Sequence, residues 1–177
     1  MSLGDEYPRI LRAYLDLARR FSGDAKRVLK TDAFNEARGL PMPGGIALNI
    51  RGDVFAVEAD RSTYEQALAL GVQARHGDIR SLPFPDARFD VVLDFSTIDH
   101  VVEYATVLAE YSRVLVCGGT LVVVFWAKPS LEVVNTQVYL PFDEFVVQFQ
   151  SRFHEDERAI VYEEPDRALW LLIGRRR

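Results

Sequence analysis

Acidic side chains stand at the ends of three predicted β-strands. Asp32 directly follows the first strand, Glu58 ends the second, and Asp94 lies near the end of the fourth. Parallel strands end at a common edge of their sheet, and open α/β sheets bind ligands at this edge. An ionised carboxylate accepts hydrogen bonds from hydroxyl and ammonium groups. The pattern therefore predicts a site here for a ligand rich in hydrogen-bond donors.

Asp99 and His100 are the candidate acid–base pair of the sequence. Histidine titrates near neutral pH and could take a proton from a substrate oxygen or nitrogen. Adjacent residues of a helix do not face each other, so the two side chains are not a ready dyad. The alternatives for His100 are that it lines a pocket or has a structural role. We therefore predict Asp99 and His100 as candidate catalytic residues.

An alternation of strands and helices must position these side chains. Apolar residues at helical spacing predict a helix over Pro8–Phe21, whereas residues 1–6 are expected to be irregular. Helices are also predicted over Arg61–Leu70 and Val101–Val116. The predicted strands are Arg27–Thr31, Asp53–Glu58, Val72–His76, Phe89–Phe95 and Thr120–Trp126. Strands that alternate with helices and are apolar on both faces predict a mostly parallel sheet covered by helices.

The C-terminal part departs from this alternation. A helix is predicted over Phe142–Phe149, followed by strands over Ala159–Tyr162 and Ala168–Ile173. Only the five residues Glu163–Arg167 separate these strands, and a parallel pair needs a crossover of about a dozen residues or more. The last two strands must therefore be antiparallel neighbours.

Composition excludes several classes of protein. The chain has 177 residues, of which 49% are hydrophobic and 27% charged, which is typical of one globular domain. Its net charge of −5 disfavours nucleic-acid binding, which normally uses a basic surface. The longest apolar run, Leu121–Ala127, is too short to span a bilayer. A single cysteine, Cys117, fits a reducing cytoplasm, and the cysteine and three histidines show no metal-ligand spacing.

Two segments of the sequence carry longer motifs: GDIRSLPFPDARFDVV over Gly77–Val92 and VLVCGGTL over Val114–Leu121. Both resemble motifs of the class I S-adenosylmethionine-dependent methyltransferases. The first is similar to the stretch between the third and fourth strands of that family, and the second to the entry to its fifth strand, with Cys117 where proline is usual. The resemblance covers Arg27–Trp126 in motifs and extends to the C-terminal hairpin in topology.

The resemblance implies a doubly wound, Rossmann-like α/β fold in a single methyltransferase domain. The mostly parallel seven-stranded sheet would have the order 3-2-1-4-5-7-6, with the antiparallel hairpin at the C-terminus. We expect residues 1–177 to form this one domain. It would comprise an N-terminal helix over 7–21, a cofactor-binding core over 25–127 and a C-terminal helix and hairpin over 128–177.

The resemblance also implies S-adenosylmethionine as the cofactor. Glu58 would accept hydrogen bonds from both ribose hydroxyls, Asp78 would accept one from the adenine amino group, and the Ile79 backbone N–H would face the adenine ring. The alternatives are an exposed strand-end acid for Glu58 and a turn-capping aspartate for Asp78. The complete predicted set of cofactor-binding residues is Thr31, Asp32, Ala33, Glu36, Glu58, Ala59, Asp78, Ile79, Asp94 and Phe95.

The first motif departs from the family pattern. The family has a glycine-rich turn after its first strand, whereas this chain has VLKTDAFNEA over Val28–Ala37. This string and STIDH, over Ser96–His100, resemble a variant branch of the family. Side chains disfavour the positive φ and close backbone approach that glycine permits. We therefore expect a different turn, with Asp32 or Glu36 directed into the site toward the cofactor's ammonium group. The alternative is that Asp32 caps the following helix.

The expected function is methyl transfer to an oxygen, nitrogen or carbon atom of a small molecule. Such a displacement depends mainly on holding both reactants in line. The alternative is a binding or regulatory module without catalysis, which the glycine-free turn favours. A nicotinamide-dependent enzyme is disfavoured because the pattern G-x-G-x-x-G is absent. The segment Lys128–Pro141 is short for a substrate lid, so either a partner chain, as in a homodimer, completes the pocket or the pocket is open.

Overall fold

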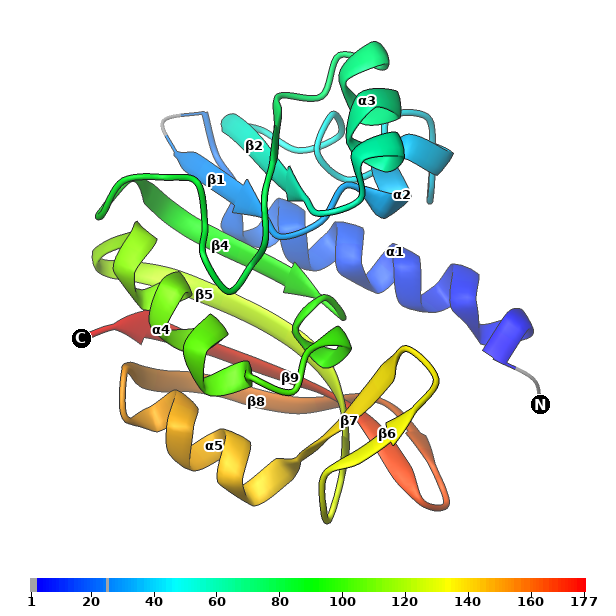
Figure 1. Cartoon of the computed structure of the whole chain (residues 1–177), viewed down its shortest axis with the longest axis vertical. Helices are drawn as coiled ribbons and strands as arrows, with labels where there is room; N and C mark the ends of the chain where they lie inside the picture. Colours follow the sequence, from blue (N-terminus) through cyan, green and yellow to red (C-terminus); the bar gives the residue numbers. More distant parts are fainter. Residues whose placement is uncertain (1–2, 25) are drawn as a thin grey trace.

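A twisted sheet with the strand order β3-β2-β1-β4-β5-β9-β8 runs through the molecule (Figure 1). It is seen in a computed structural model that describes residues 3–24 and 26–177. The first five strands pair in parallel. The bounds of the strands are β1 (Arg27–Lys30), β2 (Asp53–Glu58), β3 (Ala74–His76), β4 (Phe89–Phe95), β5 (Leu115–Lys128), β8 (Phe153–Glu164) and β9 (Arg167–Arg176).

The C-terminal hairpin confirms the predicted topology. β9 is antiparallel to β5, with Leu121 opposite Gly174 and Ala127 opposite Ala168. β8 is antiparallel to β9 and lies beyond it. When the small β6–β7 hairpin is left aside, β8 and β9 are the sixth and seventh strands. The order 3-2-1-4-5-7-6 is therefore confirmed.

The small hairpin was not predicted. β6 (Glu132–Val134) and β7 (Gln137–Pro141) are antiparallel to each other, and the end of β7 pairs in parallel with the end of β5. A strand of three exposed residues carries no alternation of apolar and polar positions that a sequence pattern could detect. The hairpin extends the sheet beyond the carboxyl end of β5.

Helices cover both faces of the sheet, which makes the fold doubly wound. α1 (Leu3–Phe21) and α3 (Arg61–Ala69) pack on one face, and α4 (Tyr104–Val114) and α5 (Phe142–Gln150) pack on the other (Figure 1). Alternate residues of β5 pack against the helices on opposite faces of the sheet, because successive side chains of a strand point to opposite faces. Val122, Val124 and Trp126 contact the α1 layer, whereas Leu121, Val123 and Phe125 contact the α4–α5 layer.

Three predictions about the helices are wrong. α1 begins at Leu3, so the irregular structure expected for residues 3–6 is wrong, while Met1 and Ser2 lie outside the described residues. Pro8 therefore lies inside α1, at its sixth residue, and not near its first turn. α4 begins at Tyr104, after a turn of 3-10 helix, η1 (Ile98–His100), that was not predicted. α2 (Phe34–Arg38) was also missed.

No helix within the described ranges is long and apolar enough to cross a membrane.

Candidate functional site

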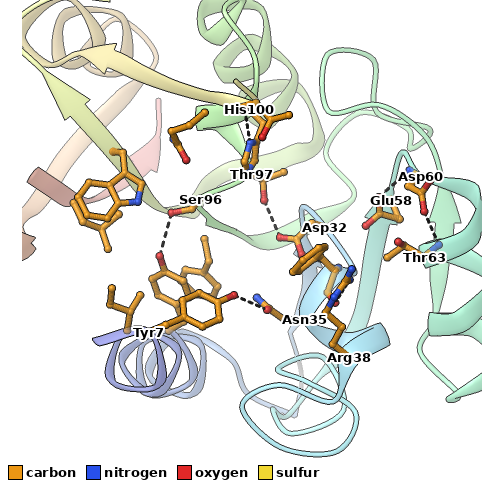
Figure 2. Close-up of a pocket in the computed structure, with 18 residues that line it drawn as sticks. Tyr7, Asp32, Asn35, Arg38, Glu58, Asp60, Thr63, Ser96, Thr97 and His100 are labelled. Carbon is orange, nitrogen blue, oxygen red and sulfur yellow. Dashed lines mark hydrogen bonds between the residues drawn. The ribbon is translucent and has the colours of Figure 1, made fainter. Parts of the chain in front are cut away.

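A cavity of about 750 Å³ opens at the carboxyl ends of β1, β2, β4 and β5 (Figure 2). Its walls come from α1, from the turns that follow these strands, and from the β6–β7 hairpin. The lining residues are Tyr7, Ile10, Tyr14, Asp32, Phe34, Asn35, Arg38, Glu58, Asp60, Thr63, Phe95, Ser96, Thr97, His100, Trp126, Thr136, Gln137 and Leu169.

The cavity includes some of the predicted site residues and leaves out others. Asp32, Glu58, Phe95 and His100 line it. The lining does not include Thr31, Ala33, Glu36, Ala59, Asp78, Ile79, Asp94 or Asp99. Whether a predicted residue lines the cavity depends on the local contacts of its side chain.

Glu58 joins the turns after β1 and β2. One carboxylate oxygen accepts a hydrogen bond from the Asp60 N–H at 2.8 Å, and the other accepts one from the Ala33 N–H at 3.1 Å. Each carboxylate oxygen has two lone pairs, so both oxygens can accept a further hydrogen bond from the cavity side. The two backbone contacts hold this half-buried carboxylate in place before any ligand binds.

Asp32 faces the cavity, and its carboxylate also contacts the first residue of α2, whose N-cap position is Ala33. Its Oδ1 accepts from the Phe34 N–H at 3.0 Å, and its Oδ2 accepts from the Thr97 hydroxyl at 2.8 Å. Burial disfavours the charged form, but the Lys30 ammonium, 2.9 Å from Oδ1, outweighs burial and lowers the pKa of Asp32. Asp32 therefore presents a negative charge at the cavity wall.

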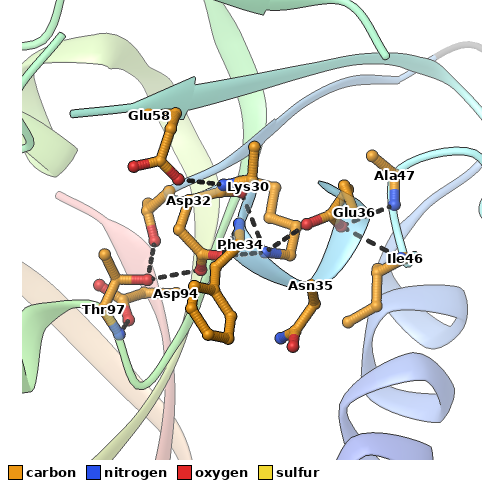
Figure 3. A network of polar contacts seen from close by, with 12 residues as sticks. Lys30, Asp32, Phe34, Asn35, Glu36, Ile46, Ala47, Glu58, Asp94 and Thr97 are labelled. Atoms are coloured by element: carbon orange, nitrogen blue, oxygen red, sulfur yellow. Dashed lines mark hydrogen bonds and ion pairs between the residues drawn. The ribbon is translucent and has the colours of Figure 1, made fainter. Parts of the chain in front are cut away.

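Glu36 points away from the cavity, which corrects the prediction that it would bind the cofactor (Figure 3). Its fully buried carboxylate lies 3.2 Å from the Nζ of Lys30, which is also fully buried. Its Oε1 accepts from the N–H groups of Ile46 and Ala47, both at 3.1 Å. A Cβ on Gly45, whose φ is +60°, would lie 2.7 Å from the Glu36 Cα, so this loop needs glycine to close over the carboxylate.

The turn after β1 has the predicted non-glycine shape. The described non-glycine residues with positive φ are Ala87, Ser96 and Asn135, so the turn over 31–38 contains none. The Lys30 ammonium donates to the Asp32 carbonyl at 3.0 Å and lies between two carboxylates. A buried ion-pair network thus takes the structural place that the glycine-rich turn has in the family pattern.

Asp94 lies beneath the cavity and does not face it. Its carboxylate accepts hydrogen bonds from the N–H groups of Thr97 and Ile98 and from the Tyr111 hydroxyl. Burial raises the pKa of Asp94 to about 6. The prediction that Asp94 contacts the cofactor is therefore corrected, because its acceptors are used to shape the turn that carries Ser96 and Thr97.

Asp99 is also buried and cannot act as a catalytic group at the cavity surface. Its Oδ2 accepts from the Trp126 N–H at 2.8 Å, while its buried Oδ1 has no hydrogen-bond partner among the described residues. Burial raises the pKa of Asp99 to about 7. The catalytic prediction for Asp99 is wrong because the side chain is enclosed by protein.

Replacement of Asp99 by asparagine is expected to flatten the dependence of stability on pH. Because the pKa of Asp99 is raised to about 7 in the folded chain, the folded state binds the proton more tightly than the unfolded state. This stabilisation is complete below the unfolded pKa and is lost as the pH rises through about 7. The free energy lost between pH 4 and 8 is on the order of 3 kcal/mol. Urea unfolding of both proteins at several pH values measures it, and equal slopes would contradict the burial argument.

His100 presents one ring nitrogen to the cavity. Its Nδ1 lies 2.8 Å from the Thr136 carbonyl oxygen, which can only accept, so Nδ1 carries the hydrogen. In the neutral ring Nε2 is then a hydrogen-bond acceptor; it lies 4.0 Å from the Asp99 Oδ1. The His100 side chain is half exposed and lines the cavity, so it remains a candidate catalytic residue.

The residues predicted to hold adenine lie outside the cavity lining. The Asp78 carboxylate pairs with the Arg80 guanidinium at 2.7 Å, and these hydrogen bonds lower the pKa of Asp78. The Ile79 side chain is buried in the core, and the Ala59 carbonyl lies 3.0 Å from the Nε2 of His76. None of the three residues is among those that line the cavity. The adenine contacts of the Asp78 carboxylate and the Ile79 N–H therefore stay a prediction.

The remaining predicted positions, Thr31 and Ala33, are buried under the turn. The Thr31 hydroxyl donates to the Thr97 hydroxyl at 3.0 Å, and the Ala33 N–H is used by Glu58. Both residues shape the cavity floor without lining it.

Sequence reasoning missed the contribution of α1. Tyr7, Ile10 and Tyr14 line the cavity from one face of this helix. The Tyr7 hydroxyl donates to the Asn35 Oδ1 at 3.2 Å, and the Tyr14 and Ser96 hydroxyls lie 3.1 Å apart. The spacing of two tyrosines at i and i+7 on the apolar face was the available signal, since these positions share a side of the helix.

Sequence comparisons find methyltransferases. Residues 44–123 match the methyltransferase domain family. The chain is 34% identical over 113 residues to the "Probable S-adenosylmethionine-dependent methyltransferase" of Mycolicibacterium smegmatis, which is 62% of this chain and 41% of that protein. It is 36% identical over 74 residues to a demethylmenaquinone methyltransferase of Anoxybacillus flavithermus, which is 42% of this chain and 31% of that protein. The matched part spans less than half of either relative.

Solved structures share the fold. The 1,6-didemethyltoxoflavin-N1-methyltransferase of Burkholderia thailandensis, with bound 1,6-didemethyltoxoflavin and S-adenosylhomocysteine, matches with a TM-score of 0.70 at 18% identity, over 94% of this chain and 78% of that one. The [4+2]-cyclase SpnF matches with a TM-score of 0.77 at 14% identity, over 94% and 80%. The two names describe different reactions, so the fold alone does not determine the chemistry.

Proposed function

We propose that the chain is a class I S-adenosylmethionine-dependent methyltransferase, which binds S-adenosylmethionine and methylates a small molecule. The observation that carries the proposal is the position of Glu58. Its carboxylate stands at the end of β2, is held by two backbone N–H groups, and belongs to a residue that lines the cavity. This arrangement suits a pair of ribose hydroxyls.

The charges around this part of the cavity also fit the cofactor. Asp32, Glu58 and Asp60 line it with one guanidinium, that of Arg38. When bound, S-adenosylmethionine supplies a methyl group on a positively charged sulfur. Asp32 would attract its ammonium and sulfonium charges, and Arg38 would pair with its carboxylate. Glu58 and Asp32 come to one cavity from strands that are neighbours in the sheet.

The same charges disfavour a dinucleotide. In dinucleotide-binding folds the pyrophosphate sits at the N-terminus of the helix that follows the first strand. Here the Asp32 carboxylate accepts from the Phe34 N–H at that position. A phosphate would meet a negative charge where it needs donors.

Calorimetric titration of the full chain is expected to show saturable one-to-one binding of S-adenosylmethionine and of S-adenosylhomocysteine. NAD, the negative control, is expected to bind at least tenfold more weakly because of the repulsion at Asp32. Absence of binding by either S-adenosyl compound at millimolar concentration would overturn the proposed function.

Methyl transfer is tested separately from binding. The chain is incubated with S-adenosylmethionine labelled in the methyl group and with the small-molecule fraction of a cell extract. We expect label in a product that chromatography separates from the cofactor. Binding without any labelled product would favour the non-catalytic module, for which the glycine-free turn over 31–38 is the specific support.

A further inference from the structure

The cavity has two chemically different ends. Glu58, Asp60 and Thr63 lie at one end in Figure 2, and Ser96 lies at the other, with Asp32 and Arg38 between them. The Ser96 end has apolar walls from Ile10, Tyr14, Phe95, Trp126 and Leu169, which come from α1, β4, β5 and β9. A cavity of about 750 Å³ lies in the upper part of the range for a drug-sized ligand, so it has room for a second, smaller molecule.

The apolar walls are closely packed. The rings of Tyr14 and Phe95 stack on each other at 4.8 Å with an interplanar angle of 8°, and the Tyr14 and Ser96 hydroxyls lie 3.1 Å apart. Both rings are almost fully buried, so their positions are fixed before any ligand binds.

Among the described residues that line the Ser96 end, none has a permanently charged side chain. The charged lining residues Asp32, Glu58, Asp60 and Arg38 all belong to the other end or to the middle of the cavity. An anionic molecule would have to leave water without a cationic partner, which is costly. Phosphorylated and carboxylated molecules are therefore disfavoured at this end.

The Tyr14 and Ser96 hydroxyls at this end are paired with each other, and the His100 ring offers a further hydrogen-bond acceptor. The Nδ1 of His100 is held by the Thr136 carbonyl at 2.8 Å, which leaves Nε2 without a hydrogen-bond partner among the described residues. The ring lies beside Thr97 and across the cavity from Tyr7 (Figure 2). A hydroxyl group of a bound molecule can donate to this nitrogen.

We propose that the Ser96 end of the cavity binds the methyl acceptor, and that the acceptor is an uncharged, largely apolar molecule whose hydroxyl group donates to the Nε2 of His100. The inference rests on the proposed function, because the Glu58 end must be the place of the cofactor. It deepens that function by stating the chemical class of the acceptor.

The test uses 1-naphthol, 1-naphthyl phosphate and 1-methoxynaphthalene as probes, titrated calorimetrically into the full chain saturated with S-adenosylhomocysteine. We expect 1-naphthol to bind at least tenfold more tightly than the phosphate, and about 3- to 10-fold more tightly than the methyl ether, which lacks the O–H donor. Equal or tighter binding of the phosphate overturns the inference. S-adenosylhomocysteine is titrated first, and its failure to bind would instead overturn the proposed function.

Two cavity variants and two control variants test where 1-naphthol binds. His100→Gln is expected to abolish the preference for 1-naphthol over its methyl ether, whereas His154→Gln, on the exposed part of β8, should leave it unchanged. Tyr7→Ser should weaken 1-naphthol at least threefold, and Tyr64→Ser, outside the cavity lining, should not. All four variants should keep the affinity for S-adenosylhomocysteine within about twofold. Unchanged probe binding in both cavity variants overturns the placement.

Discussion

Replacement of Lys30 by methionine is expected to lower the free energy of unfolding by about 3–5 kcal/mol. The ammonium is fully buried and lies 2.9 Å from the Asp32 Oδ1 and 3.2 Å from the Glu36 Oε2 (Figure 3). Methionine leaves both carboxylates without their cation, and one of them is fully enclosed by protein. Because domains of this size unfold with about 5–15 kcal/mol, the loss is a large share of the total. Urea unfolding followed by circular dichroism measures it.

Two further variants separate the charge effect from the loss of packing. Lys26→Met, at an exposed position, should change the free energy of unfolding by less than about 0.5 kcal/mol. The double change Lys30→Met with Glu36→Gln should recover about 1–3 kcal/mol, because it removes an uncompensated buried charge and keeps an acceptor for the Ile46 and Ala47 N–H groups.

The destabilisation by Lys30→Met should also depend on pH. Without the cation, burial raises the pKa of both carboxyl groups, so the folded state binds more protons than the unfolded state. The variant should therefore be less destabilised at pH 5 than at pH 8. A loss below about 1 kcal/mol at pH 8 would mean that this network does not hold the glycine-free turn together.

Replacement of Glu58 by alanine is expected to raise the dissociation constant of S-adenosylmethionine about 10- to 150-fold. A carboxylate that accepts two hydroxyl hydrogen bonds contributes a net of about 1.5–3 kcal/mol, and each 1.4 kcal/mol is about tenfold. Calorimetry measures the affinity. The control is Glu65→Ala on α3, whose side chain is 61% exposed and pairs only with Arg61 among the described residues. Equal affinities for the parent chain and both variants would show that Glu58 does not hold the ribose.

The structure also predicts that Glu58→Ala lowers the stability of the fold. The carboxylate accepts from the Ala33 and Asp60 N–H groups, so alanine removes two hydrogen bonds and should cost about 1–2 kcal/mol of stability. Asp60 is exposed, so water can replace the partner of its N–H, whereas Ala33 is fully buried and its N–H carries most of the loss. Because this cost is smaller than the stability of the domain, the variant should remain folded at 25 °C. Thermal unfolding of the same samples verifies that the affinity refers to folded protein.

The positions of the main strands could be predicted from the sequence. The bounds of β2 and β4 agree with the predicted strands to the residue, because apolar patterning and the flanking turns are local properties. The five-residue connection between the last two predicted strands excluded a parallel pair, and β8 and β9 are indeed antiparallel, whereas the strand order followed from the family resemblance. The positions of Asp32 and Glu58 at the cavity followed from their places at strand ends, since parallel strands end at one edge.

The directions of the other polar side chains depend on the tertiary structure. Glu36 and Asp32 are both acids of one short turn, yet Glu36 turns inward because the buried Lys30 ammonium needs a second carboxylate in a medium of low dielectric constant. Asp78 turns toward Arg80, two residues away, and leaves the cavity. Tyr14 reaches Ser96 across 82 positions of sequence. Periodicity determines which face of an element is apolar, whereas the direction of a polar side chain depends on partners that only folding brings within reach.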